Sequence, residues 1–277
     1  MRVCLGALLV GALFVSGCGA GLFASSGDGV DAFHYEETRV PVGVVYHYLK
    51  SNQDGSKPER VSLYMVNRDT IETFKFREPN PTFAAHVTAT MDWTRLSVTK
   101  LESKQMTKGG AERAIATAEY EPSAHTLSIQ LNDLPSQTIP ISALPFHIYS
   151  FELASLNMAL RHLVHPEGSI TFGIASPTYA DKGPVFEYRG EATLTFTKNE
   201  DYEGKACRKY RLDGPGVKDH GGFLWLDKAE GHIIALDIAQ PNHPDFESFK
   251  MKLMFTDTMS PDEWKDFMKS RLETETN

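Results

Sequence analysis

Most of this chain alternates between apolar and polar residues with a period of two. Leu127, Ile129 and Leu131, for example, would share one face of a strand, and the residues between them are polar. Strict alternation is typical of antiparallel strands that pack one face and expose the other. Turn-forming residues follow at short intervals, so neighbouring strands should pair in a meander. About a dozen strands are predicted, at 42–50, 60–66, 71–76, 86–91, 95–103, 113–120, 126–131, 169–174, 192–197, 205–212, 222–226, 234–238 and 249–255.

A segment in the middle of the chain follows the period of a helix instead. Between Phe146 and Leu163 the apolar residues recur every three or four positions, which predicts one apolar stripe along a helix. Pro145 precedes this segment and Pro166 ends it. The stripe consists of Tyr149, Leu153, Leu156, Leu160 and Leu163.

A second helix is predicted near the C-terminus. Ser260 suits the N-cap, Pro261 suits the first turn, and Glu263 can reach back to complete a capping box. The apolar side of this helix would be formed by Trp264, Phe267 and Met268.

These elements together predict a mostly β fold, a curled antiparallel sheet or half-open β-barrel with two helices. A long meander has two exposed edges unless it closes, curls or is covered, and curling around the apolar stripe would meet that need. The stripe is then either a plain core helix or a movable plug over a lipid-sized cavity. Under the second interpretation the ligand-binding residues are Tyr149, Leu153, Leu156, Leu160 and Trp225.

The first eighteen residues have the pattern of a secretory signal. Arg2 precedes an apolar run over 3–15, which is shorter than the ~20 residues a membrane-spanning helix needs. Val15-Ser16-Gly17-Cys18 follows and resembles a bacterial lipobox. That resemblance implies cleavage of a signal peptide over 1–17 and lipidation of Cys18. An ordinary signal, cut after Ala20 or Ala24, is the alternative.

The domain organisation follows from this signal. Residues 18–32 would be the lipidated cysteine and a flexible tether of small residues, and residues 33–277 a single β-rich domain. No aspartate follows Cys18 directly, which in enteric bacteria resembles an outer-membrane address. We therefore expect a lipid anchor on the periplasmic face of the outer membrane.

Composition and charge exclude some partners. The net charge of −8 argues against nucleic acid, whose phosphates need a basic surface. Of the three cysteines, Cys4 would leave with the signal and Cys18 would carry lipid, so Cys207 has no disulfide partner. We expect Cys207 to be a buried apolar residue.

Sequence motifs for catalysis and metal binding are missing. The chain has no nucleophile elbow, no zinc-protease histidine pair, no phosphate-binding glycine loop and no paired-cysteine motif. His162 and His165 lack a third ligand nearby. We therefore expect that the protein is not an enzyme and that it has no catalytic residue, no metal site and no cofactor. A hydrolase with scattered residues remains an alternative, which needs a cleft that gathers a histidine, a carboxylate and a hydroxyl.

Residues 190–255 resemble a group of periplasmic β-sheet proteins. The resemblance lies in Leu224-Trp225-Leu226-Asp227, the turn after it, and Gly231-His232-Ile233. The group includes domain-of-unknown-function envelope proteins and LolA/LolB-like lipoprotein carriers. It implies a half-open antiparallel barrel with helices in its mouth and, as in the carriers, a cavity for acyl chains.

The leading hypothesis is a non-enzymatic lipoprotein that binds an apolar ligand such as an acyl chain. The alternative is an envelope scaffold or assembly factor that binds a partner protein without a cavity.

Overall fold

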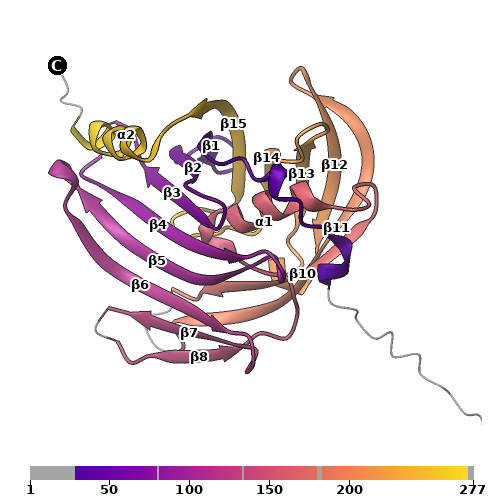
Figure 1. Cartoon of the computed structure of the whole chain (residues 1–277), viewed down its shortest axis with the longest axis horizontal. Coiled ribbons are helices and arrows are strands. Elements are labelled where there is room, and N and C mark those ends of the chain that lie inside the picture. The colour runs from indigo at the N-terminus through magenta and orange to yellow at the C-terminus, as the bar shows by residue number, and fades with distance from the viewer. Residues whose placement is uncertain (1–28, 80, 133, 180–182, 274–277) are drawn as a thin grey trace, which may run out of the picture.

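One large curled sheet makes up most of the molecule (Figure 1). The computed structural model describes residues 29–273, apart from residues 80, 133 and 180–182. In these residues the sheet has 15 strands. The first half contains β1 (Val44–Ser51), β2 (Glu59–Met65), β3 (Thr70–Phe76), β4 (Phe83–Asp92), β5 (Ser97–Thr107), β6 (Glu112–Glu121), β7 (Thr126–Leu131) and β8 (Gln137–Pro140). The second half contains β9 (Phe146–Ile148), β10 (Ser169–Pro177), β11 (Phe186–Tyr202), β12 (Lys205–Asp213), β13 (Gly222–Asp227), β14 (Ile233–Ile238) and β15 (Phe249–Thr258).

The strand order confirms the predicted meander and the mostly β, unclosed fold. Two runs of sequential strands, β1 to β8 and β9 to β15, join where β1 pairs antiparallel with β15. All other neighbours also pair antiparallel, except that β9 is parallel to β10. Each predicted strand overlaps an observed one, whereas β8 and β9 were not predicted. These two short strands are the edges of the sheet.

The Gln137 side chain connects the edge strand β8 to β11, near the other end of the curled sheet. Gln137, at the start of β8, donates through Nε2 to the carbonyl of Phe186 at 2.7 Å. Its Oε1 accepts from the backbone N–H groups of Val185 at 2.8 Å and Phe186 at 3.0 Å. Both ends of the Gln137 amide thus bond β8 to the backbone at the start of β11.

The segment predicted as one helix over Phe146–Leu163 is interrupted, and this corrects the sequence prediction. After β9 come a 3-10 turn, η4 (Tyr149–Phe151), the short α1 (Ala154–Ala159) and a second 3-10 turn, η5 (Leu160–His162). Glu152 and Leu153, with φ of 52° and 54°, are left-handed and separate η4 from α1. The whole segment lies inside the curl of the sheet (Figure 1). Because it is buried on every side, an apolar stripe alone does not define its conformation.

The second helix, α2 (Pro261–Glu273), is close to its prediction. The capping box forms, since the Ser260 N–H donates to Glu263 Oε2 at 2.7 Å. The resemblance placed helices in the mouth of the barrel, but α2 covers the opposite face of the sheet from α1. There its apolar side joins a separate cluster under the helix: Val45, Tyr64, Phe74, Phe76, Ala84, Met106, Trp264, Met268 and Leu272.

The N-terminal residues that the structure describes pack on the sheet. Residues expected at the end of the tether form η1 (Gly29–Ala32), where Val30 and Ala32 contact the core. Val164 N–H donates to the Ala32 carbonyl at 3.0 Å. The predicted signal peptide, Cys18 and the start of the predicted tether lie outside the described residues. Within the described part of the chain, no helix has the length and apolar character to cross a membrane.

Candidate functional site

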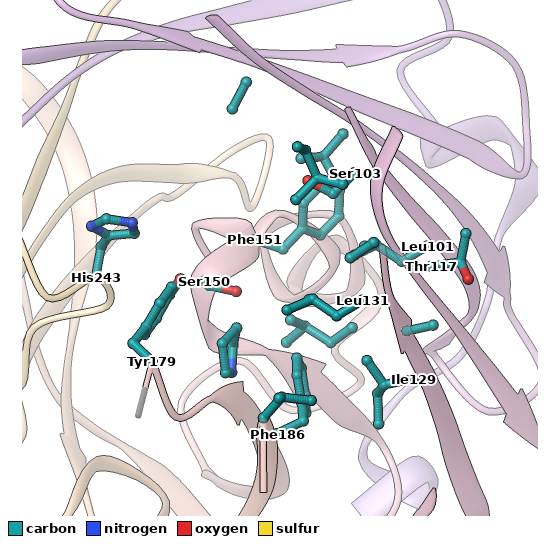
Figure 2. Close-up of a pocket in the computed structure, with 18 of the residues that line it drawn as sticks. Leu101, Ser103, Thr117, Ile129, Leu131, Ser150, Phe151, Tyr179, Phe186 and His243 are labelled. Carbon is teal, nitrogen blue, oxygen red and sulfur yellow. The ribbon is translucent and has the colours of Figure 1, made fainter. Parts of the chain in front are cut away.

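The candidate site is a cavity of about 400 Å³ inside the curled sheet (Figure 2). It lies between the concave face of β3 to β7 and the residues of β9 and η4. It is close to the seam, by which we mean the contact of Gln137 with Val185 and Phe186 at the start of β11. Most of its wall is apolar, and Figure 2 shows Leu101, Ile129 and Leu131 on one side, with Phe151 and Phe186 beside them. Ligand pockets in proteins usually measure ~300–1,000 Å³ and are mainly apolar.

The other end of the cavity is polar. Lys75, Ser150, Tyr179 and His243 line it, and Figure 2 shows the last three together, away from Leu101 and Ile129. The rings of Tyr179 and His243 pack edge to face, with centroids 4.8 Å apart. Burial lowers the pKa of His243 below its ordinary value, so the ring is neutral at pH 7. The cavity thus has the two-ended character of an amphiphile.

Strand alternation explains why a lysine reaches this interior. On β3, Ile71 and Thr73 point to the concave face, and Phe74 and Phe76 point under α2. Lys75 has the parity of Ile71 and Thr73, so its side chain enters the cavity.

A buried ion-pair network holds Lys75 in place. Its Nζ lies 2.9 Å from Glu152 Oε2 and donates to the Ser150 carbonyl at 3.3 Å. Glu152 Oε1 also accepts from Lys50 Nζ at 3.1 Å and from Asn242 Nδ2 at 3.2 Å. Burial lowers the pKa of Lys75, but the carboxylates of Glu152 and Glu59 outweigh it and raise this pKa overall. Lys75 is therefore a fixed cation at the polar end.

The four predicted stripe residues lie in the packed core rather than in the cavity wall. Tyr149, Leu153, Leu156 and Leu160 are at most 2% exposed. Tyr149 Oη donates to the Gln240 carbonyl at 2.7 Å. Phe151, in the same segment, does line the cavity and was not predicted. A ligand in this cavity would touch Phe151 and not those four residues.

Trp225 is separated from those four residues. It lies on the other face of the sheet, where Lys209 Nζ is 4.8 Å from its ring centroid. Its Nε1 donates to Glu200 Oε1 at 2.5 Å. Leu224, the next residue back on β13, is fully buried, and Trp225 is itself 9% exposed and belongs to the same core cluster. Successive side chains of a strand point to opposite faces of the sheet, so Leu224 and Trp225 face opposite sides.

Two histidine–serine contacts are relevant to the hydrolase alternative. His147 Nδ1 lies 2.9 Å from Ser155 Oγ, and His47 Nδ1 lies 2.9 Å from Ser62 Oγ. Among the residues that the structure describes, no carboxylate bonds to either ring, so neither contact forms a triad. The same part of the chain contains no cluster of three metal-ligating side chains.

Two further predictions can be compared with the structure. His162, one of the histidine pair, is buried, and its Nδ1 accepts the Glu36 N–H at 3.2 Å. Cys207 is free and buried as predicted, and burial raises its thiol pKa to about 11. A thiol with that pKa is a poor nucleophile near neutral pH.

No protein-family model matches the chain, and no curated protein does either. Among solved structures, the chain is similar to a β-barrel-like protein of a domain of unknown function from Brucella abortus, at 8% identity and a TM-score of 0.39. That alignment covers 78% of this chain and 97% of the other.

A second similar structure is titled "putative outer membrane lipoprotein-sorting protein domain" and comes from Vibrio parahaemolyticus. It has 10% identity and a TM-score of 0.23, and the alignment covers 84% of this chain and 94% of the other. Both are of the kinds that residues 190–255 resemble. The curled, unclosed sheet is established by its own strand order.

Proposed function

We propose that this protein is a lipid-anchored envelope protein that binds an acyl chain in the cavity between β3–β7 and η4. The observation that carries the proposal is the mainly apolar cavity of about 400 Å³ inside the curled sheet. Burying an acyl chain against Leu101, Ile129 and Phe186 would remove apolar surface from water, at roughly 25 cal/mol per Å².

The polar end determines the direction in which such a ligand would lie. The Lys75 ammonium and the Tyr179 hydroxyl can meet a carboxylate or ester oxygen, whereas the opposite end is mainly apolar, with the hydroxyls of Ser103 and Thr117 among its leucines and isoleucines. The headgroup would therefore lie toward Lys75, and the chain would extend toward Ile129 and Leu131. The same proposal places the anchor on Cys18, on the periplasmic face of the outer membrane. Two acyl chains are needed for stable anchoring.

A matched pair of variants tests the cavity. Ala116 lines it, and Glu119 on the same strand is exposed on the other face. In the full chain carrying Cys18→Ala, Ala116→Phe should fill the space and abolish saturable binding of a fluorescent fatty acid. Glu119→Phe adds the same ring outside and should bind as before. Thermal melting would verify that both variants fold. Equal probe affinity in the two variants contradicts an acyl chain in this cavity.

The anchor is tested by metabolic labelling in bacteria with a clickable palmitate. We expect label on the full chain and none on Cys18→Ala. Label that persists in Cys18→Ala would rule out this attachment site.

A further inference from the structure

A second cavity is unusually basic. It measures about 610 Å³ and lies at the other end of the buried segment, where η5 meets the β13–β14 turn and the residues just before β1. Its wall contains four cations and one carboxylate: Arg39, Arg161, Arg208, Lys228 and Glu230. In a chain with a net charge of −8, this concentration of positive charge needs an explanation.

Arg161 is the innermost of these cations. Its side chain is 3% exposed, and Nη2 donates to the Tyr46 hydroxyl, over whose ring the guanidinium lies. The nearest carboxylate oxygen is Glu230 Oε2, 3.8 Å from Nη1, on a side chain that is 68% exposed. Its Nε is buried and has no hydrogen-bond partner. A buried guanidinium with so little compensation is costly by itself.

Arg208 is only partly buried but also has few partners. Its Nη1 donates to the Lys228 carbonyl at 2.9 Å, and its Nε is buried without a hydrogen-bond partner. Among the residues that the structure describes, no ion pair joins Arg208 or Lys228 to a carboxylate. Arg39 is the one cation of the four with a close carboxylate, Glu36 Oε2 at 3.0 Å.

The two histidines beside Arg161 do not offset this charge, and among the described residues Asp227 forms no ion pair with these cations. His162 and His232 border Arg161, and burial lowers the pKa of each to about 4, with the positive charge of Arg161 adding to the effect. Both rings are therefore neutral at pH 7. Asp227 Oδ1 is occupied by the N–H groups of Ala229 and Glu230.

We propose that this basic cavity binds a phosphate-type oxyanion, with Arg161, Arg208 and Lys228 as the ligands. Guanidinium groups present planar N–H pairs that match phosphate oxygens, and charge-assisted hydrogen bonds of this kind are strong. The anion would supply the missing acceptors for buried N–H groups. The same chemistry is offered by inorganic phosphate and by a phospholipid headgroup. This site is independent of the acyl cavity.

The test uses two double variants that remove the same charge. Arg208→Gln with Lys228→Gln changes the cavity, and Arg211→Gln with Lys218→Gln changes side chains that are 64% and 53% exposed elsewhere. In the full chain with Cys18→Ala, calorimetry at low salt would measure inorganic phosphate, and co-sedimentation would compare phosphatidylglycerol with phosphatidylcholine vesicles. We expect the cavity variant to weaken binding by roughly tenfold or more, and the control by less than about twofold.

The two arms distinguish the source of the anion. Saturable phosphate binding lost in the cavity variant supports a free anion, and loss confined to phosphatidylglycerol vesicles supports a headgroup. Failure of both probes to bind, or equal binding by the two double variants, overturns the proposal. The fluorescent fatty acid should still bind the cavity variant, which verifies that the variant folds.

Discussion

Glu152 is a buried carboxylate on which two lysines converge. Its left-handed backbone breaks the helix that the sequence predicts, and its side chain meets Lys50, Lys75 and Asn242. A buried ion pair adds little net stability over apolar packing, but removing one partner leaves an uncompensated charge. The network adds little stability over apolar packing, but the folded state cannot lose one of its members without a large cost.

Glu152→Gln should show this dependence. The substitution keeps the shape and removes the charge, leaving Lys75 without its close carboxylate. We expect a loss of about 3 kcal/mol or more in the free energy of unfolding, measured with urea. Glu102→Gln removes a carboxylate that is 38% exposed beside Lys100, and it should cost about 1 kcal/mol or less. Similar losses in both variants would show that burial of the network does not matter.

His147 makes the stability depend on pH. Burial lowers the pKa of this ring to about 3, from the ordinary 6.5 that it has in the unfolded chain. The unfolded state therefore takes up a proton first, so stability is complete above about pH 6.5 and falls as the pH drops. Between pH 6.5 and 4.5 this residue alone should account for roughly 2 to 3 kcal/mol.

His147→Gln should reduce the slope of the free energy of unfolding against pH by up to one proton, whatever stability it loses at pH 8. His220→Gln, at an exposed histidine, should leave the slope as in the parent chain. Urea unfolding at several pH values between 4.5 and 8 gives the slopes. An unchanged slope in His147→Gln would mean that other groups cause the acid sensitivity.

At the scale of elements, alternation predicts the strands well because many of them have one packed and one more exposed face, although β1, β2 and β14 are largely buried on both faces. It misses β8 and β9, which have only four and three residues. It overestimates the helix at 146–163, since full burial makes every apolar spacing compatible with packing. A cavity was among the predictions, but its lining could not be predicted, because the wall comes from segments far apart in sequence. Phe151 gave no signal among equally apolar neighbours, and nothing local revealed that Lys75 would pair with Glu152.

The α2 helix covers its face of the sheet mainly through Trp264. This ring packs on Tyr64 with centroids 5.0 Å apart, and its Nε1 donates to Glu72 Oε2 at 2.6 Å. Trp264→Ala should cost about 3–5 kcal/mol of docking energy and release α2 from the sheet. Hydrogen exchange should then speed up in α2 and change little in β10 to β13. Lys265→Ala, at a side chain that is 64% exposed, is the control, and a still-protected α2 in Trp264→Ala contradicts this prediction.

At the scale of the whole molecule, a glutamine next to the cavity links the edge strand β8 to β11, near the other end of the sheet. Gln137→Leu removes three hydrogen bonds to Val185 and Phe186, and Phe186 also lines the cavity. We expect faster amide exchange at Val185 and Phe186 and faster entry of the fatty-acid probe. Thr138→Val, on the same strand and exposed, should change neither. Unchanged exchange in Gln137→Leu would show that other contacts hold the seam.

The pairing of β1 with β15 also constrains how the molecule is made. The strands β1 and β15 lie far apart in the sequence, so the two runs of strands cannot join until synthesis has reached β15. Such long-range pairing is slow, because a large loop must close before any contact compensates for it. A chain shortened before residue 249 would leave β1 and β14 with open edges. Open edges recruit other chains, so the shortened protein should self-associate rather than form a smaller version of the same sheet.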